Sequence, residues 1–192
     1  MIRTRFLAAA ALALLLAGCG FHLRNRIALP SDLGPVLVKT SSRYSDLAYK
    51  LVRGLQVAGA NARIPTAADI AEQKAAATSG SGEGSKAELA IVSERWGNLP
   101  IAVDSLGRAQ EYSLRYAVVF VFRRADGTEL VPQQVVELSR DYVSRPQNAT
   151  GTTTEREILA DELRREMSAS ILRRIDGVVR AGQMVQPAAD GT

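Results

Sequence analysis

The sequence predicts an α+β fold in which two amphipathic helices pack on one face of a four-stranded mixed sheet, in the order β-α-β-β-β-α. Three features predict it: strand-like alternation of apolar and polar residues in the middle of the chain, a helical stripe of apolar residues on each side, and hairpin turns between strands. With 192 residues, 46% hydrophobic and 23% charged, the chain has an ordinary globular composition.

The N-terminal part of this fold is a strand followed by a helix. The apolar segment 34–40 opens with Gly and Pro and predicts the first strand. Within residues 43–58, leucines recur at a spacing of four, which predicts a helix with one buried stripe. Serines just before the stripe are candidate N-caps, and Gly59 is a natural stop signal.

The next segment reads as an insertion. Residues 62–65 can form a brief extended piece, after which residues 67–86 are Ala-rich and polar and end in TSGSGEGSK. Gly/Ser-rich segments behave as flexible coil and cannot bury a core. We therefore expect a flexible insertion on a loop, at about residues 67–86.

Three further strands are predicted, with turns between them. Segments 88–96, 110–123 and 130–143 have strand character, and the second shows the clearest alternation. Turn residues at 104–107 and at 125–127 join the three segments into hairpins. Pro100 lacks an N–H for the ladder, so we expect a bulge or an edge position there.

The last element is a second helix. Thr154 to Glu157 fits a capping box, in which the hydroxyl accepts an early N–H and Glu157 reaches back. Apolar residues then recur at helical spacing to about Val179. Residues 183–192 are expected to form a disordered tail, which leaves one domain over residues 19–182.

The N-terminus carries a targeting signal. Residues 1–18 have a positive start, an apolar run too short to span a bilayer, and a small-residue end, as secretory signal peptides do. Leu16-Ala17-Gly18-Cys19 resembles the bacterial lipobox, so Cys19 is the expected lipid attachment site. Gly20, rather than Asp, follows it and favours the outer membrane by the enteric sorting rule.

Composition argues against most catalytic classes. One Cys and one His exclude an internal disulfide, a Cys-cluster zinc site and two-histidine metal motifs. Removing Arg3 and Arg5 with the signal peptide leaves 22 basic against 20 acidic residues, about +2, which gives no indication of nucleic-acid binding. We therefore expect no enzyme activity, no metal and no cofactor; a hydrolase built on His22 is the last-ranked alternative.

Binding is the stronger hypothesis. Four apolar residues lie beside Arg108 near the tip of the hairpin around residues 104–107, namely Leu99, Ile101, Val103 and Leu106. Arg145 lies next to Pro146 in the loop before the last helix. Apolar side chains mixed with guanidinium groups suit an amphiphile with phosphates. The plainer alternative is hairpin packing with ordinary surface arginines.

The segment after the lipobox resembles a known family. Cys19-Gly20-Phe21-His22-Leu23-Arg24 is similar to the start of the LPS-assembly lipoprotein LptE (RlpB) family. The likeness continues in the element order, in Gly107 followed by Glu111-Tyr112, and in Arg145-Pro146-Gln147 before the last helix. It covers residues 19–180 apart from the segment 72–86.

The resemblance implies a function that composition alone does not. Members of the family are lipid-anchored, periplasm-facing lipoproteins of the outer membrane that plug the lumen of the LptD β-barrel, help assemble it, bind lipopolysaccharide and take part in its transport to the outer leaflet. In this chain Ser105 and Thr152 occupy the registers of the family's basic residues, so Arg108 and Arg145 are the candidate lipopolysaccharide-binding residues. The alternative is a stand-alone periplasmic lipoprotein that carries an amphiphile without a barrel.

Overall fold

The computed structural model of the chain describes residues 27, 29–30, 33–42, 44–79, 86–144 and 149–185, without the side chains of 76–79, 149–152 and 183–185. The expected signal peptide, the lipid attachment site Cys19, His22 and Arg145 lie outside the described residues, as does the expected tail from residue 186 onward.

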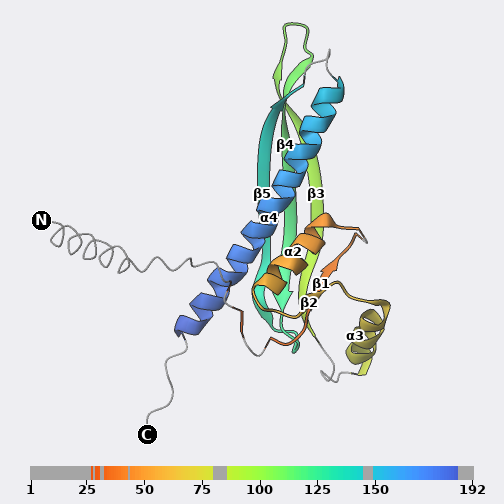
Figure 1. Cartoon of the computed structure of the whole chain (residues 1–192), viewed down its shortest axis with the longest axis vertical. Coiled ribbons are helices and arrows are strands. Elements are labelled where there is room, and N and C mark those ends of the chain that lie inside the picture. The colour runs from red at the N-terminus through yellow and green to blue at the C-terminus, as the bar shows by residue number, and fades with distance from the viewer. Residues whose placement is uncertain are drawn as a thin grey trace, which may run out of the picture.

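One mixed sheet forms the centre of the molecule (Figure 1). Its spatial order is β2-β1-β3-β4-β5. The strands are β1 (Val36–Thr40), β2 (Ala62–Arg63), β3 (Ala87–Val103), β4 (Ala109–Arg123) and β5 (Glu129–Val143). β1 pairs in parallel with β2 and β3, whereas β3, β4 and β5 are antiparallel. The predicted α+β class with a mixed sheet is confirmed, but the described part has five strands and three helices rather than four and two.

The first helix matches its prediction closely. α2 (Asp46–Val57) buries the leucine stripe against the sheet, with Leu47, Leu51 and Leu55 fully buried. Among the candidate caps the structure selects Ser45, whose hydroxyl accepts the backbone N–H of Ala48 at 3.2 Å. Beyond the C-terminus of the helix, Gly59 has φ of 95°, a conformation that glycine adopts without steric cost.

The three long strands form two consecutive hairpins that set the length of the molecule (Figure 1). Both turns contain a glycine with positive φ, Gly107 at 76° and Gly127 at 85°. Pro100 pairs with Tyr112, and a register shift follows between Pro100 and Ala102, as its missing N–H predicts. β1 pairs with β3 only as far as Ile91, so among the described strands the rest of β3 pairs with β4 alone.

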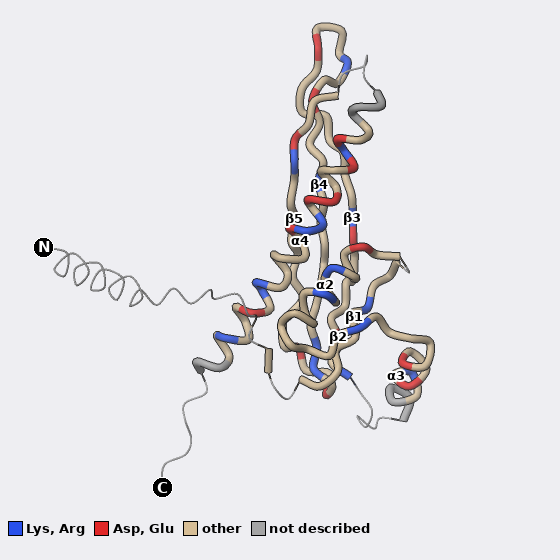
Figure 2. The backbone as a smooth tube through the Cα atoms, in the orientation of Figure 1, with Lys and Arg blue, Asp and Glu red and all other residues tan. Residues whose placement is uncertain are grey.

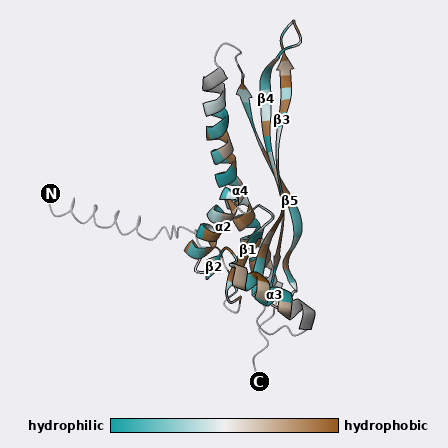
Figure 3. Cartoon of the chain, turned by 90° about the vertical axis from the view of Figure 1, so that its right-hand side faces the viewer, coloured by the Kyte–Doolittle hydropathy of each residue, from teal (hydrophilic) through white to brown (hydrophobic). Residues whose placement is uncertain are grey.

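The last helix, α4 (Ala149–Val185), begins before the predicted capping box and continues into the expected tail. α4 and α2 lie on the same face of the sheet (Figure 3). The core between helices and sheet contains the apolar side of β4 and the α4 stripe Leu163, Met167, Ile171, Ile175 and Val179. The other sheet face is mixed in character, as the alternation of β4 predicts.

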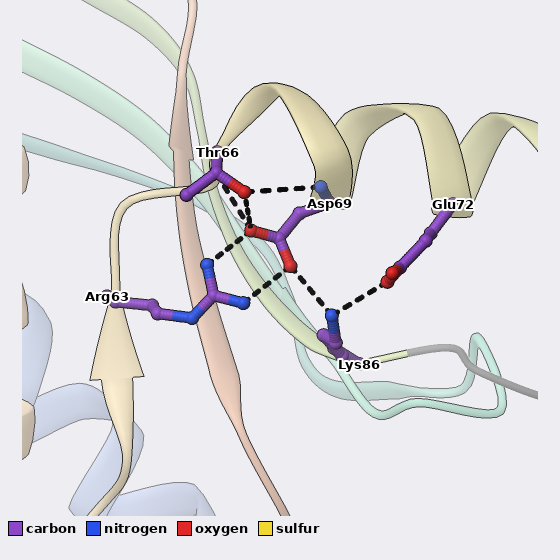
Figure 4. Close-up of polar contacts among 5 residues, drawn as sticks. All are labelled: Arg63, Thr66, Asp69, Glu72 and Lys86. Carbon is purple, nitrogen blue, oxygen red and sulfur yellow. Dashed lines mark hydrogen bonds and ion pairs between the residues drawn. The ribbon is translucent and has the colours of Figure 1, made fainter.

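The predicted loop insertion is wrong over its first part, because residues 67–79 form helix α3 (Ala67–Ser79). α3 has little apolar surface to bury, and polar contacts attach it to the domain (Figure 4). Asp69, which is 2% exposed, accepts hydrogen bonds from the Arg63 guanidinium on β2 and from Lys86 Nζ at 2.7 Å. The hydroxyl and backbone N–H of Thr66 donate to the same carboxylate. These contacts join both ends of the insertion.

Candidate functional site

The turn between β3 and β4 is organised by one carboxylate. Asp104 accepts the backbone N–H groups of Leu106 and Arg108, each at 2.9 Å, and the Arg108 Nε at 2.8 Å. The backbone N–H of Arg108, followed by its side chain, holds the pKa of Asp104 below its usual value. The Arg108 side chain is 62% exposed and keeps further N–H donors free for a ligand, because its contact to Asp104 uses Nε.

The strand leading into this turn exposes apolar side chains. Leu99, Ile101, Val103 and Leu106 are between 45% and 74% exposed. The segment from Gly97 to Val103 carries no charged residue. We call Leu99–Arg108 the hairpin tip. Its mixture of exposed apolar groups and a guanidinium is the combination that the sequence predicts, and the structure places it at one end of the long axis (Figure 1).

Arg145, the other candidate lipopolysaccharide-binding residue, lies outside the described residues. The segments on either side of its loop are described: β5 ends at Val143, which pairs with Glu111, and the Ser144 N–H donates to the Gln110 carbonyl at 2.8 Å. α4 begins at Ala149, at the same end of the molecule as the hairpin tip (Figure 1). The structure thus brings both ends of the Arg145 loop to this end.

A second polar centre, which the sequence analysis does not identify, lies on the part of β3 that precedes the hairpin tip. The Glu94 carboxylate accepts the Tyr116 hydroxyl at 2.6 Å and the Ser45 hydroxyl at 2.9 Å. Burial, with the hydrogen bond to Glu94 second, raises the pKa of Tyr116 well above its usual value. Because Ser45 also caps α2, this carboxylate links the start of α2 to β3 and β4.

Trp96 extends this centre toward α4. Its ring stacks on Tyr116, with centroids 3.9 Å apart and an interplanar angle of 13°. The Arg164 guanidinium of α4 lies 5.1 Å from the centroid of the Trp96 ring and 3.7 Å from the Asp46 carboxylate. Arg164 lies among charged residues of α4, yet it contacts an aromatic ring. In the sequence, the one indication of this contact is the aromatic residue Trp96 on β3, on the side that faces the helix.

The charges of α4 are interspersed in sign (Figure 2). Within the described part of the chain, no group of three or more His, Cys, Asp or Glu side chains is arranged to hold a metal ion. No helix among these residues combines the length and the apolar character needed to cross a membrane. The described side chains that could contact a ligand or partner are aromatic rings, exposed apolar groups and guanidinium groups.

Solved structures share this fold. Rare lipoprotein B from Shewanella oneidensis has 21% sequence identity and a TM-score of 0.58, and the match covers 78% of this chain and 99% of that one. An uncharacterized lipoprotein B from Nitrosomonas europaea has 21% identity and a TM-score of 0.62, over 86% and 96%. A minor lipoprotein from Acinetobacter baumannii has 14% identity and a TM-score of 0.56, over 77% and 94%. At these identities the likeness shows the fold alone.

Comparison with curated proteins gave no match. The family comparison did: the profile described as "LptE: Lipopolysaccharide-assembly" matches residues 34–175. That range runs from the start of β1 deep into α4 and includes the hairpin tip and the Glu94 centre. It confirms the resemblance that the residues after the lipobox indicate. Since the match covers most of the sequence, the chain belongs to the LptE family of lipopolysaccharide-assembly proteins.

Proposed function

We propose that this protein is a lipid-anchored outer-membrane lipoprotein that plugs and helps assemble an LptD-type β-barrel. In this proposal Cys19 carries the lipid, the domain faces the periplasm and lies within the barrel lumen, and no bond is made or broken at its surface. The protein also binds lipopolysaccharide directly and takes part in its insertion into the outer leaflet. The observation that carries the proposal is the LptE-family match over residues 34–175.

The shape of the domain supports the plug. The long β3–β4–β5 hairpins and α4 run side by side along the long axis (Figure 1), which suits a cylinder more than a flat surface. Along the upper part of the sheet no described helix lies over the face opposite α2 and α4 (Figure 3). This open face includes Val135, which is 60% exposed, and the exposed ion pair of Arg115 with Glu137. Such a surface is suited to contact a partner.

The hairpin tip supports lipopolysaccharide binding. Lipopolysaccharide presents acyl chains close to phosphates, and the tip presents apolar side chains close to Arg108. A guanidinium binds phosphate through two parallel hydrogen bonds, so Arg108 has the right chemistry for the anionic part. Arg145, in the segment between β5 and α4, is the second candidate.

Co-purification is the decisive experiment. The protein is isolated from detergent-solubilised membranes, and the proteins that accompany it are identified by mass spectrometry. We expect an outer-membrane barrel at constant stoichiometry. Recovery of the chain by itself would favour the alternative, a stand-alone periplasmic lipoprotein that carries an amphiphile.

Photocrosslinking tests the contact surface separately. A photoreactive residue replaces Glu137 on the open face, and a matched variant carries it at Arg173 on the exposed side of α4. We expect a higher yield of crosslinked barrel from position 137. A yield no higher than that from position 173 would show that the open face is not the main contact surface.

A further inference from the structure

We infer that the cleft between the N-terminal part of α4 and the sheet binds one aliphatic chain of a lipid whose anionic headgroup lies against Arg156. We call this space the α4 cleft. It is distinct from the hairpin tip, has a volume of about 380 Å³, and is lined by Trp96, Leu114, Thr153, Arg156, Glu157, Ala160 and Arg164. That volume lies within the range of about 300–1,000 Å³ found for small-molecule sites.

The cleft follows from a mismatch between helix and sheet. From Leu163 onward the side of α4 that faces the sheet is apolar and buried. Toward the N-terminus this stripe ends at the half-buried Leu159 and Ala160. The preceding turns present exposed Thr153, Arg156 and Glu157. The sheet opposite remains apolar, with Leu114 and Trp96. Figure 3 shows α4 and the strands diverging toward this end.

An aliphatic chain fits the inner wall of the cleft. The surface that lines it is mostly apolar, and the flat Trp96 ring is held in place by its stack on Tyr116. Trp96 is 36% exposed although its ring contacts both Tyr116 and Arg164. An acyl chain that covered this ring would remove apolar surface from water, which favours binding.

The charges at the cleft favour an anionic headgroup. Arg156 is exposed and has no ion-pair partner among the described side chains, whereas Arg164 already contacts Trp96 and Asp46. Two of the three charged residues that line the cleft are arginines, and the third is Glu157. A phosphate or carboxylate at the mouth would pair with Arg156. An apolar peptide side chain would leave this guanidinium unpaired, which is why we assign the cleft to a lipid.

This inference rests on the proposed function, since a protein that handles lipopolysaccharide meets acyl chains attached close to phosphates. It concerns a different surface from the hairpin tip and needs no barrel. The plug proposal and the α4 cleft inference can therefore fail independently. Co-purification tests the plug, and a titration of the isolated protein tests lipid binding in the cleft.

The test uses Trp96, the sole tryptophan in the sequence, as the reporter. The purified protein is titrated below the micelle concentration with dodecyl phosphate, with dodecyl maltoside and with inorganic phosphate. We expect saturable change in Trp96 emission with dodecyl phosphate, binding at least about tenfold weaker with dodecyl maltoside, and no change with phosphate alone. Dodecanoic acid brominated on its terminal carbon should quench Trp96. The inference would be overturned if inorganic phosphate changed Trp96 emission as much as dodecyl phosphate does. It would also be overturned if dodecyl phosphate gave no saturable response.

Two variants localise the signal. Ala160→Phe places a ring in the cleft and should weaken binding of dodecyl phosphate by at least about tenfold. Arg156→Gln, a surface change that preserves folding, should reduce the preference for dodecyl phosphate over dodecyl maltoside. Arg173→Gln on the exposed side of the same helix is the matched control and should bind like the parent protein. Unchanged binding in Arg156→Gln and in folded Ala160→Phe would place the lipid elsewhere.

Discussion

The Tyr116 hydroxyl, at the centre of the sheet, donates a hydrogen bond of 2.6 Å to the Glu94 carboxylate. Tyr116 is fully buried, so its hydroxyl depends on this acceptor. The same carboxylate accepts the hydroxyl of Ser45, the residue that caps α2. One side chain of β3 therefore satisfies a buried donor and positions the start of a helix.

Replacing Glu94 should destabilise the domain. Glu94→Ala leaves the Tyr116 hydroxyl unpaired in the core, and an unsatisfied buried polar group costs about 1–3 kcal/mol. Urea denaturation measures the free energy of unfolding. The control is Glu129→Ala, which removes an exposed ion pair with Arg123 and should change stability by no more than about 0.5 kcal/mol. Equal losses in the two variants would show that the buried hydrogen bond contributes nothing special.

Asp69→Asn should release α3 while the rest of the domain stays folded. The substitution removes the charge that pairs with Arg63 and Lys86, and α3 buries too little apolar surface to stay attached without it. We expect faster amide hydrogen exchange and faster proteolysis within residues 67–79. Glu72→Gln, which removes only the exposed contact to Lys86, is the control. Unchanged protection of α3 in Asp69→Asn would contradict this interpretation of the cluster.

The attachment of α3 should also depend on pH. Hydrogen bonds from Arg63 first, and then from Lys86 and Thr66, hold the pKa of Asp69 far below its unperturbed value of 3.8. A carboxyl group whose pKa falls on folding stabilises the folded state above its unfolded pKa, and this contribution is lost as the pH falls below that value. Exchange within α3 should therefore be constant from neutral pH to about pH 5 and rise below about pH 4, after correction for intrinsic rates. The difference between parent and Asp69→Asn should shrink over the same acidic range.

Reversing the charge at both candidate arginines tests lipopolysaccharide binding. Arg108→Glu with Arg145→Glu should reduce binding of lipopolysaccharide to the purified protein, because carboxylates repel its phosphates. Association with the barrel should remain measurable. Arg53→Glu with Arg173→Glu makes the same charge change at exposed positions on α2 and α4. If both double variants lose binding equally, the effect is one of net charge; if neither does, the lipid binds another surface.

Cys19→Ala tests the anchor. Without the thiol no lipid can be attached, so a smaller fraction of the chain should remain with the membrane. Cys19 precedes the described domain, and we expect the urea midpoint of the purified variant to equal that of the parent protein. Retention in the membrane at the parent's level would show that the barrel, and not the lipid, holds the protein there.

The sequence predicts the parts of the fold that local patterns determine. The alternation along β4 and the leucine stripe of α2 each predict an element that the structure confirms, because period and burial agree there. α3 has no such stripe; it is attached by Asp69 through residues distant in sequence, Arg63 and Lys86. The α4 cleft was likewise beyond local reasoning, since it depends on Trp96 of β3 facing the turns of α4 around Arg156. Arg108 directly follows the predicted turn, and both Arg108 and Arg145 remain predictions as lipopolysaccharide-binding residues.

The glycine at position 54, inside α2, is also explained by a contact with a residue distant in sequence. A glycine inside a helix normally costs about 1 kcal/mol relative to alanine. Here α2 and α4 approach so closely that a Cβ at Gly54 would lie 2.3 Å from Leu172 Cδ1 of α4. A larger residue at this position therefore requires the Leu172 side chain to move.

Gly54→Ala should destabilise the domain even though it improves helix propensity. Leu172 is 8% exposed and packed in the core, so its side chain cannot move away freely, and overpacking costs about 1–3 kcal/mol. The matched control is Gly177→Ala in α4, where a Cβ meets nothing within 4 Å and stability should rise by about 0.5–1 kcal/mol. In a Leu172→Ala background the cost of Gly54→Ala should disappear, because the clashing methyl group is gone. A stabilising Gly54→Ala would mean that α2 and α4 separate without cost, and the close approach of the helices would then not explain the glycine.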